Sequence, residues 1–238
     1  MLLLYQRSDK KKKRSDKMIR YFDEELKELK EKILQMGTIS EEMIDYATKA
    51  LMEEKEELIQ EVFTRENKIN QLHIEIDEMA LQLLALHQPT AIDLRFITAG
   101  IKINSDLERI GDLTINITDN ILTLLKQPQL KPYLDLPRMN LFAKEMLRKS
   151  LDAFINKDVE LARSVLLMDT EVDNLKDQIF RELLTFMLSD SQAIERALAL
   201  ILISRHLERI ADHATNIAED AIFIVMGKDV RHHLEKKE

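Results

Sequence analysis

Two acidic segments share a spacing of side chains that suits metal ions. In "DLERIGDLTINITDN", residues 106–120, a glutamate is followed four residues later by an aspartate and four residues after that by an asparagine. The segment "HLERIADHATNIAED", residues 206–220, repeats this spacing. Carboxylates one helical turn apart have Cβ atoms roughly 6 Å apart, close enough to chelate or bridge a cation, and an amide oxygen adds a neutral ligand. The candidate ligands are Glu108, Asp112, Asn116, Asp119, Glu208, Asp212, Asn216 and Glu219.

On a helix these acids lie on the side opposite the apolar residues. With about 100° between successive residues, each acidic stripe is roughly 160° away from its apolar stripe, so the acids point away from their own core. An exposed charged face that only meets water is the ordinary explanation of such a pattern. However, like charges one turn apart destabilise a helix by a few tenths of a kcal/mol, and both segments accept this at matching places. Metal binding and simple solvation therefore both remain open.

The available ligand types restrict the metal but do not identify it. The chain has no cysteine, so any site consists of oxygen ligands with at most an occasional imidazole. Such ligands suit Mg, Ca, Mn, Fe or Zn and argue against a closed structural zinc site. His206 and His213 flank the second segment and are optional ligands or surface histidines. Arg109 and Arg209 either neutralise the acids beside them or offer a contact for phosphate or for a partner's acid.

An internal duplication accounts for the repeated segment. The stretch from Met43 aligns without a gap with the stretch from Met146 at an offset of 103 residues, and the two "LERI" motifs align at an offset of 100. Helical apolar periodicity predicts three helices in each copy. Their expected ranges are 17–53, 56–88 and 90–126 in the first copy, and 137–156, 158–188 and 191–226 in the second.

Local signals set the limits of these helices. Pro89 cannot continue a helix, and Thr90 with Asp93 has capping-box spacing, so a helix is expected to end and another to begin there. Asp158 is expected to cap the helix that follows it. Gly37, inside a long helical pattern, is a candidate bend. Three of the four prolines fall in "KQPQLKPYLDLPR", which is expected to join the two copies.

The fold class predicted is therefore all-α, with two tandem antiparallel three-helix bundles. Few glycines and prolines, no tryptophan and 33% charged residues fit a helical, soluble protein. The expected units are residues 17–127 and 137–228, because an amphipathic helix needs partners to bury its apolar stripe. Residues 1–16 are expected to form a disordered basic extension or, alternatively, a tether to anionic lipid or to a partner.

Composition also limits the cellular context. A net charge of −8 makes broad binding to nucleic acid unlikely in physical terms, since like charges repel. No stretch approaches the ~20 apolar residues of a membrane span, and the short apolar start precedes its charges, unlike a signal peptide. The absence of cysteine fits a reducing cytoplasm. A cytoplasmic protein is expected.

The chain resembles the PhoU family of phosphate-specific transport system accessory proteins, which regulate phosphate uptake. The resemblance runs from about Tyr21 to Gly227 and includes "QPTAIDLRFITAGIKINSDLERIGDLTINI" and "RHLERIADHATNIAEDAIFIVMGKDV". The family's acidic motif falls on Glu108 with Asp112 and on Glu208 with Asp212. The resemblance implies that these residues bind multinuclear iron or zinc, with Mg or Mn as further candidates. It also implies a homodimer and no catalytic residues.

The same resemblance implies a regulatory function and its partners. It indicates a non-enzymatic negative regulator that links a phosphate ABC transporter, through the ATPase subunit, to a sensor histidine kinase of the phosphate-starvation response. Contact with both partners would place the protein at the inner face of the membrane. The two alternatives are a structural helical adaptor that needs no metal, and a carboxylate-bridged di-iron enzyme. The enzyme is disfavoured because inward-facing Glu-x-x-His pairs are missing, and no "GxxxxGK" loop indicates nucleotide hydrolysis.

Acids on the middle helix of each copy are expected to complete the metal sites. The second copy offers Asp169 and Asp173, whereas the first has Glu66 and Asn70 at the paired places. Fewer formal charges hold cations less tightly, so the two sites are not expected to be equally occupied.

Overall fold

The computed structural model describes the backbone of residues 2–228 and 230 and the side chains of residues 21–228 and 230. The described part of the chain is helical and contains no strand, as predicted. The helices are α1 (Leu2–Glu53), α2 (Glu57–His87), α3 (Ala91–Leu124), α4 (Asp135–Asn156), α5 (Val159–Ser189) and α6 (Ile194–Met226), with a 3-10 turn η1 (Ser191–Ala193) between α5 and α6. Among these residues no helix is long and apolar enough to cross a membrane.

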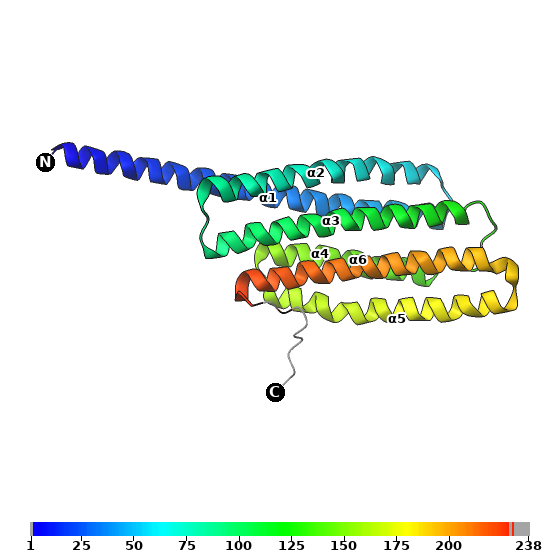
Figure 1. Cartoon of the computed structure of the whole chain (residues 1–238). Helices are drawn as coiled ribbons and strands as arrows, with labels where there is room; N and C mark the ends of the chain where they lie inside the picture. The colour runs from blue at the N-terminus through cyan, green and yellow to red at the C-terminus, as the bar shows by residue number, and fades with distance from the viewer. Residues whose placement is uncertain (1, 229, 231–238) are drawn as a thin grey trace, which may run out of the picture.

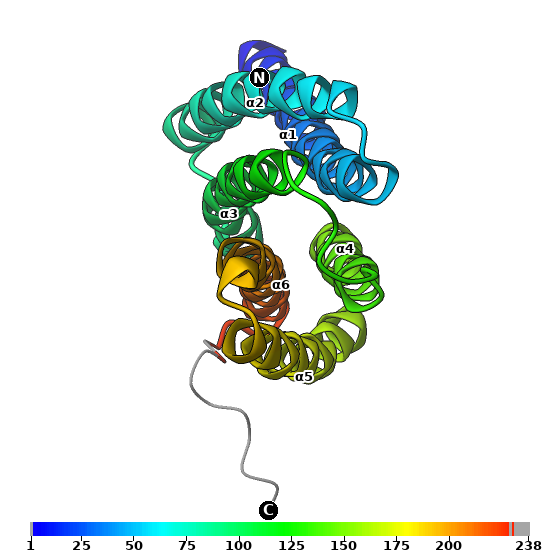
Figure 2. The ribbon, with the colours of Figure 1, turned by 90° about the vertical axis from the view of Figure 1, so that its right-hand side faces the viewer.

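The six helices lie side by side along one long axis (Figure 1). Seen end on, α2 and α5 lie at opposite edges, and α1, α3, α4 and α6 lie between them (Figure 2). Each copy forms a three-helix bundle in which neighbours run antiparallel, so the predicted architecture is confirmed. The ten residues between α3 and α4 join the two bundles, in the proline-containing stretch that was predicted to do so.

The helix ends follow the local sequence signals. Asp158 caps α5, its side chain accepting a hydrogen bond from the backbone N–H of Leu161 at 3.0 Å. Thr90 precedes the first residue of α3 in an extended conformation, as the capping-box spacing predicts, but its side chain makes no capping hydrogen bond. Gly227 ends α6 with a φ of 66°, a left-handed conformation that glycine adopts without the steric cost of a Cβ atom.

The start of α1 differs from the prediction of a disordered extension over residues 1–16. In the structure α1 is continuous from Leu2, and its first turns project beyond the other helices (Figure 1). Residues 2–16 contain no glycine or proline, and lysine, arginine, leucine and glutamine all have high helix propensity. Extending an existing helix also avoids the cost of nucleating a new one, so a helix formed at residue 21 onward continues toward the N-terminus.

The two bundles share one apolar core. The buried apolar residues of all six helices form a single cluster, and the rings of Phe96 on α3 and Phe154 on α4 stack with centroids 4.5 Å apart. Gly37, predicted as a candidate bend, lies where α1 crosses α4. A Cβ atom at Gly37 would lie 2.2 Å from a methyl group of Leu151. The glycine therefore permits the close approach of the two bundles.

Candidate metal centre

The second copy brings its predicted ligands together between α5 and α6. Glu208 and Asp212 on α6 lie within electrostatic range of Asp169 and Asp173 on α5, and all four carboxylates belong to the predicted set. We call these residues the α5–α6 acidic cluster. Glu208 is more sheltered than the prediction of an outward-pointing face implies, since its side chain is only 22% exposed. Glu208 thus borders the groove between the two helices, whereas Asp212 is exposed to solvent.

Lys176 provides the positive charge in this cluster. Its Nζ atom donates a hydrogen bond to Asp173 at 3.0 Å and another to Glu208 at 3.1 Å. These bonds raise the pKa of Lys176 above its ordinary value although partial burial acts in the opposite direction. Lys176 therefore links α5 to α6 and neutralises part of the cluster, a role that the sequence pattern did not reveal.

One lysine does not balance four carboxylates. Burial, followed by the negative charges of Glu208, Asp169 and Asp173, raises the pKa of Asp212 to about 6. Burial and the charges of Asp173 and Glu208 also raise the pKa of Asp169. Burial is the largest cause of both shifts, and the neighbouring negative charges, whose repulsion a bound cation would relieve, add to it.

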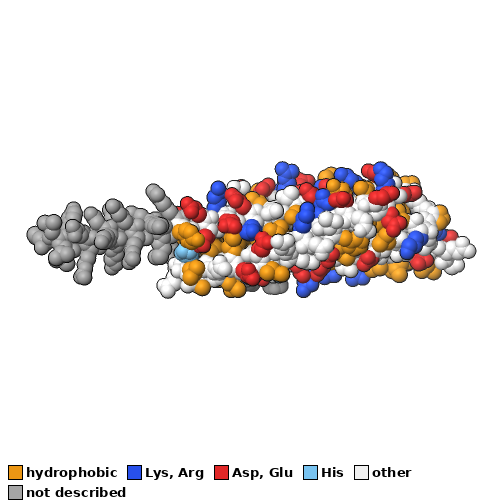
Figure 3. Space-filling model, turned by 90° about the horizontal axis from the view of Figure 1, so that it is seen from above, with side chains coloured by type: hydrophobic (Ala, Val, Ile, Leu, Met, Phe, Trp, Pro, Cys, Tyr) orange, Lys and Arg blue, Asp and Glu red, His pale blue; other side chains and the backbone are white. Residues whose placement is uncertain are grey.

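In the first copy, an arginine of the same helix neutralises the acids. Arg109 on α3 donates a hydrogen bond to Asp112 at 2.9 Å and lies 3.5 Å from Glu108. The guanidinium is 63% exposed, Glu108 is about as sheltered as Glu208, and Asp112 is partly buried whereas Asp212 is exposed. Arg109 therefore contacts the acids of its own helix, as the first of its two alternatives predicts. Glu66 is partly buried and Asn70 exposed on α2. The face seen from above also carries acids and bases in alternation (Figure 3).

The outer positions of both predicted stripes contribute less. Asn116, Asp119 and Asn216 are exposed, while Glu219 is partly buried. Asn116 accepts a hydrogen bond from Asn120 through its backbone carbonyl, so its amide side chain is not used in that contact. No described group of three or more histidine, aspartate or glutamate side chains is arranged tightly enough to hold one ion.

The donor chemistry of the α5–α6 acidic cluster nevertheless fits a metal. Its all-oxygen composition suits hard or borderline cations. Glu208, Asp212, Asp169 and Asp173 would hold the ion there, and Lys176 would have to leave its present hydrogen bonds. In the first copy, Arg109 already contacts both Glu108 and Asp112.

Sequence reasoning missed a set of polar contacts between the two copies. Asp106 on α3 lies 2.8 Å from Nδ1 of His213 on α6, and Lys102 donates to Asp220 at 3.1 Å. His213 therefore contacts the other copy instead of being a free surface histidine. Asp220 is buried in the apolar stripe of α6. An acid at an apolar position of a helix is the sequence feature that could have predicted this structural role. Burial and the charges of Arg209 and Arg205 lower the pKa of His206.

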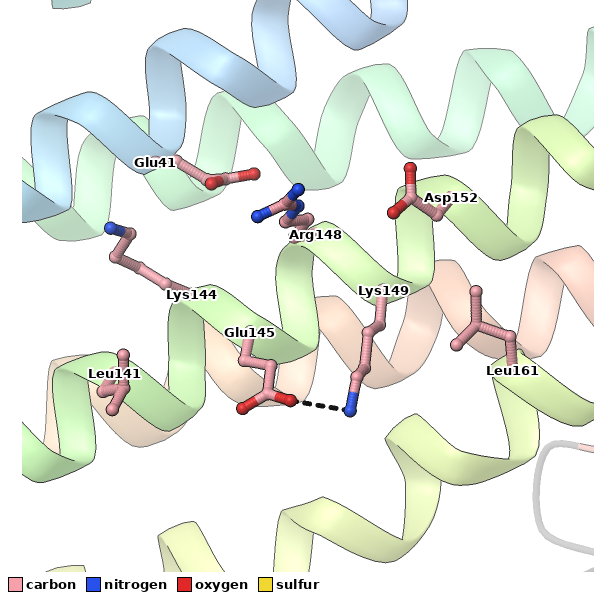
Figure 4. Close-up of a pocket in the computed structure, with 8 residues that line it drawn as sticks. All are labelled: Glu41, Leu141, Lys144, Glu145, Arg148, Lys149, Asp152 and Leu161. Carbon is pink, nitrogen blue, oxygen red and sulfur yellow. Dashed lines mark ion pairs between the residues drawn. The ribbon is translucent and has the colours of Figure 1, made fainter.

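A separate groove of about 550 Å³ lies between α1, α4 and the start of α5. Figure 4 shows Arg148 pointing into the groove between Glu41 and Asp152, with the ion pair of Lys149 and Glu145 on the far side. Burial raises the pKa of Glu41 despite the nearby positive charges. Three bases and three acids line the groove, so it has no excess charge that would attract an anion such as phosphate.

Together the fold and these faces define a class: duplicated all-helical proteins that carry an acidic motif on the third helix of each copy. Comparison with known proteins identifies that class. The PhoU domain matches residues 33–121 and 136–221, once for each bundle. The phosphate-specific transport system accessory protein PhoU homolog of Aquifex aeolicus is 42% identical over 214 residues, which cover 90% of this chain and 97% of that protein.

Solved structures agree. The crystal structure of PhoU from Pseudomonas aeruginosa has a TM-score of 0.83 at 37% identity, covering 87% of this chain and all of that one. The phosphate transport system regulatory protein PhoU from Streptococcus pneumoniae has a TM-score of 0.81 at 30% identity, covering 88% and 99% of the two chains. The chain belongs to the PhoU family.

Proposed function

We propose that this protein is a non-enzymatic accessory protein of phosphate transport that represses phosphate uptake and the phosphate-starvation response. The match of both bundles to the PhoU domain, over nearly the full length of the relatives, carries the proposal. Those relatives are named as accessory or regulatory proteins of phosphate transport.

We further propose that the protein links the ATPase subunit of a phosphate ABC transporter to a sensor histidine kinase. In this role it works as a homodimer in the cytoplasm, at the inner face of the membrane, and reaches the membrane through its partners. Large apolar side chains exposed along α2, α5 and the ends of α3 and α6 support a function in protein contacts, since exposed apolar patches mark interaction surfaces.

The acidic faces are proposed to bind metal ions, with iron or zinc first and Mg or Mn as further candidates. A bound ion supplies positive charge that replaces Lys176 among the carboxylates and fixes α5 relative to α6. The proximity of Glu208, Asp169 and Asp173 to Asp212 supports this assignment, because their negative charges add to burial in raising the pKa of Asp212. Asn116, Asp119, Asn216 and Glu219 are the outer residues of the same proposed sites.

A metal-independent helical adaptor is the second candidate. The Lys176 and Arg109 hydrogen bonds favour it, because each acidic face already has an internal cation. The two candidates predict different results when the carboxylates are replaced by amides of the same size. Regulation should be lost only if the protein requires metal.

A reporter of the phosphate-starvation response in the native host tests the proposal. Deleting the gene should raise reporter expression in high phosphate, and the wild-type gene should restore repression. The variant Glu108→Gln/Asp112→Asn/Glu208→Gln/Asp212→Asn should fail to restore it. Full restoration by this variant would favour the metal-independent adaptor, and an unchanged reporter after deletion would contradict the regulatory function itself.

A further inference from the structure

An unusually apolar surface lies at the closed end of the α5–α6 hairpin. Five large apolar side chains there are exposed by between 41% and 80%, with Leu188 the most exposed. We call them the hairpin patch: Phe180, Leu184, Leu188, Ile194 and Leu198. Their exposure costs free energy, because burial of apolar side chains of this size stabilises a protein. Such a patch is typical of a surface that a partner covers.

The patch is continuous across the two helices. On α5 the apolar residues recur every four positions from Phe180, so they share one side of the helix. The three-residue turn η1 connects α5 to α6, and the Lys176–Glu208 hydrogen bond fixes the antiparallel register. Extending that register toward η1 places Leu184 within about one helical turn of Leu198, and Leu188 within about one turn of Ile194.

The same surface continues into the α5–α6 acidic cluster. Leu184 follows Asp173 by 11 residues, close to three helical turns, and Ile194 precedes Asp212 by 18 residues, which is five turns. Asp177, between the apolar and acidic ends, has a side chain that is 66% exposed. Over residues 171–198 there are six acids and three bases, a net charge of −3. One face therefore has an apolar end and an acidic end.

The first copy lacks this combination. At the positions equivalent to Phe180, Leu188 and Leu198 it has Asp77, Ala85 and Thr98. Asp77 accepts a hydrogen bond from the buried Asn104 at 2.9 Å, so that position holds α2 to α3. Leu81 and Leu94, at the positions of Leu184 and Ile194, are also exposed, so the first copy keeps two of the five apolar positions and the second copy carries all five.

We propose that the hairpin patch and the acids beside it that lie outside the proposed metal site, such as the exposed Asp177, bind an amphipathic helix of a partner protein, whose apolar side chains are followed along the helix by lysine or arginine. Apolar contacts would supply affinity, and the acids would fix the direction of the bound helix through charge complementarity. The proposal deepens the accessory function given above, on which the existence of a partner rests. A partner with acidic flanks would be repelled at the same surface.

Binding of a defined probe tests the proposal with purified full-length protein. The probe is a fluorescent helical peptide of about 20 residues with a leucine stripe in one half and lysines in the other. Fluorescence anisotropy should show that Leu184→Ser/Leu188→Ser/Ile194→Ser weakens binding about tenfold or more, a loss of about 1.4 kcal/mol. Leu188→Ser alone, at the most exposed position, should weaken it in the same direction without a risk to folding.

The first copy provides a matched control. Ile74→Ser/Leu81→Ser/Leu94→Ser replaces side chains that are 58%, 62% and 43% exposed and should leave affinity unchanged. A probe with glutamates in place of lysines should not bind. Equal loss in both triple variants, or no loss in the patch variants, would overturn the proposal. So would a wild-type dimer that the patch variants convert to monomers, since the occupant would then be a second copy. Reporter repression, scored separately, shows whether the regulatory function fails as well.

Discussion

The two copies share a backbone frame but balance charge in different ways. On α3 an exposed arginine, Arg109, neutralises Glu108 and Asp112 from the same helix. On α6 the neutralising group is Lys176, which comes from the neighbouring helix and is three-quarters buried. The two copies therefore share the acidic motif, but the neutralising base comes from the same helix in the first copy and from the neighbouring helix in the second.

This difference indicates that the second copy is the more electrostatically strained. Four carboxylates share one lysine there, and the pKa of Asp212 is raised to about 6. In the first copy the middle helix adds Glu66 and Asn70 instead of two aspartates. A cation should consequently bind the second copy more tightly, and changes of charge should affect it more.

The largest effect is expected from the core that both copies share. Phe154→Ala removes a fully buried ring that stacks on Phe96 of the other bundle. The free energy of unfolding should fall by about 3–5 kcal/mol. Chemical denaturation followed by circular dichroism should still show one transition, because the copies share a core; two separated transitions would show that the bundles fold independently.

Removal of each counter-charge compares the copies directly. Lys176→Met should lower the free energy of unfolding of metal-free protein by about 2 kcal/mol, because it leaves partly buried carboxylates without their partner. Arg109→Met should cost less than about 0.5 kcal/mol, since exposed ion pairs contribute little. Urea titration of both variants measures this difference. Equal losses in the free energy of unfolding would show that the two acidic faces do not differ in how much their counter-charge stabilises the fold.

The contact between α1 and α4 tests how tightly the bundles are held together. Gly37→Ala places a methyl group against Leu151, and the resulting overpacking should exceed the gain in helix propensity, for a net loss of about 1 kcal/mol. In a Leu151→Ala background the same change should no longer be unfavourable, because the clashing methyl groups are absent. Thermal unfolding of the four proteins completes this double-mutant cycle.

The smallest predicted effect is a pH dependence that belongs to the second copy. Because the folded-state pKa of Asp212 is raised above its unfolded value, the folded protein binds this proton more tightly, and stability falls as pH rises from about 4 to about 6. Asp212 is exposed, so solvent screening should limit the effect to about 1 kcal/mol. Asp212→Asn should abolish it in metal-free protein, whereas Asp112→Asn should not.

The sequence predicted the elements and the duplication well, because apolar periodicity, prolines and caps are local signals. That acids of the middle helix, Asp169 and Asp173, join those of α6 was implied by the resemblance to the PhoU family and not by any helical pattern. It did not predict Lys176 or the contacts of Asp106 with His213 and of Lys102 with Asp220. Those contacts depend on how α3 packs against α6, a tertiary arrangement that no single-helix pattern encodes.

The most direct test of the proposed metal sites is to measure metal binding after the acidic face of each copy has been removed separately. Isothermal titration of metal-free protein with Zn²⁺ should be performed on the wild type, on Glu108→Gln/Asp112→Asn and on Glu208→Gln/Asp212→Asn. The account predicts that the second double variant loses the tighter binding, by about tenfold or more in affinity, while the first retains it. No binding to the wild type, or the same loss in both variants, would contradict it.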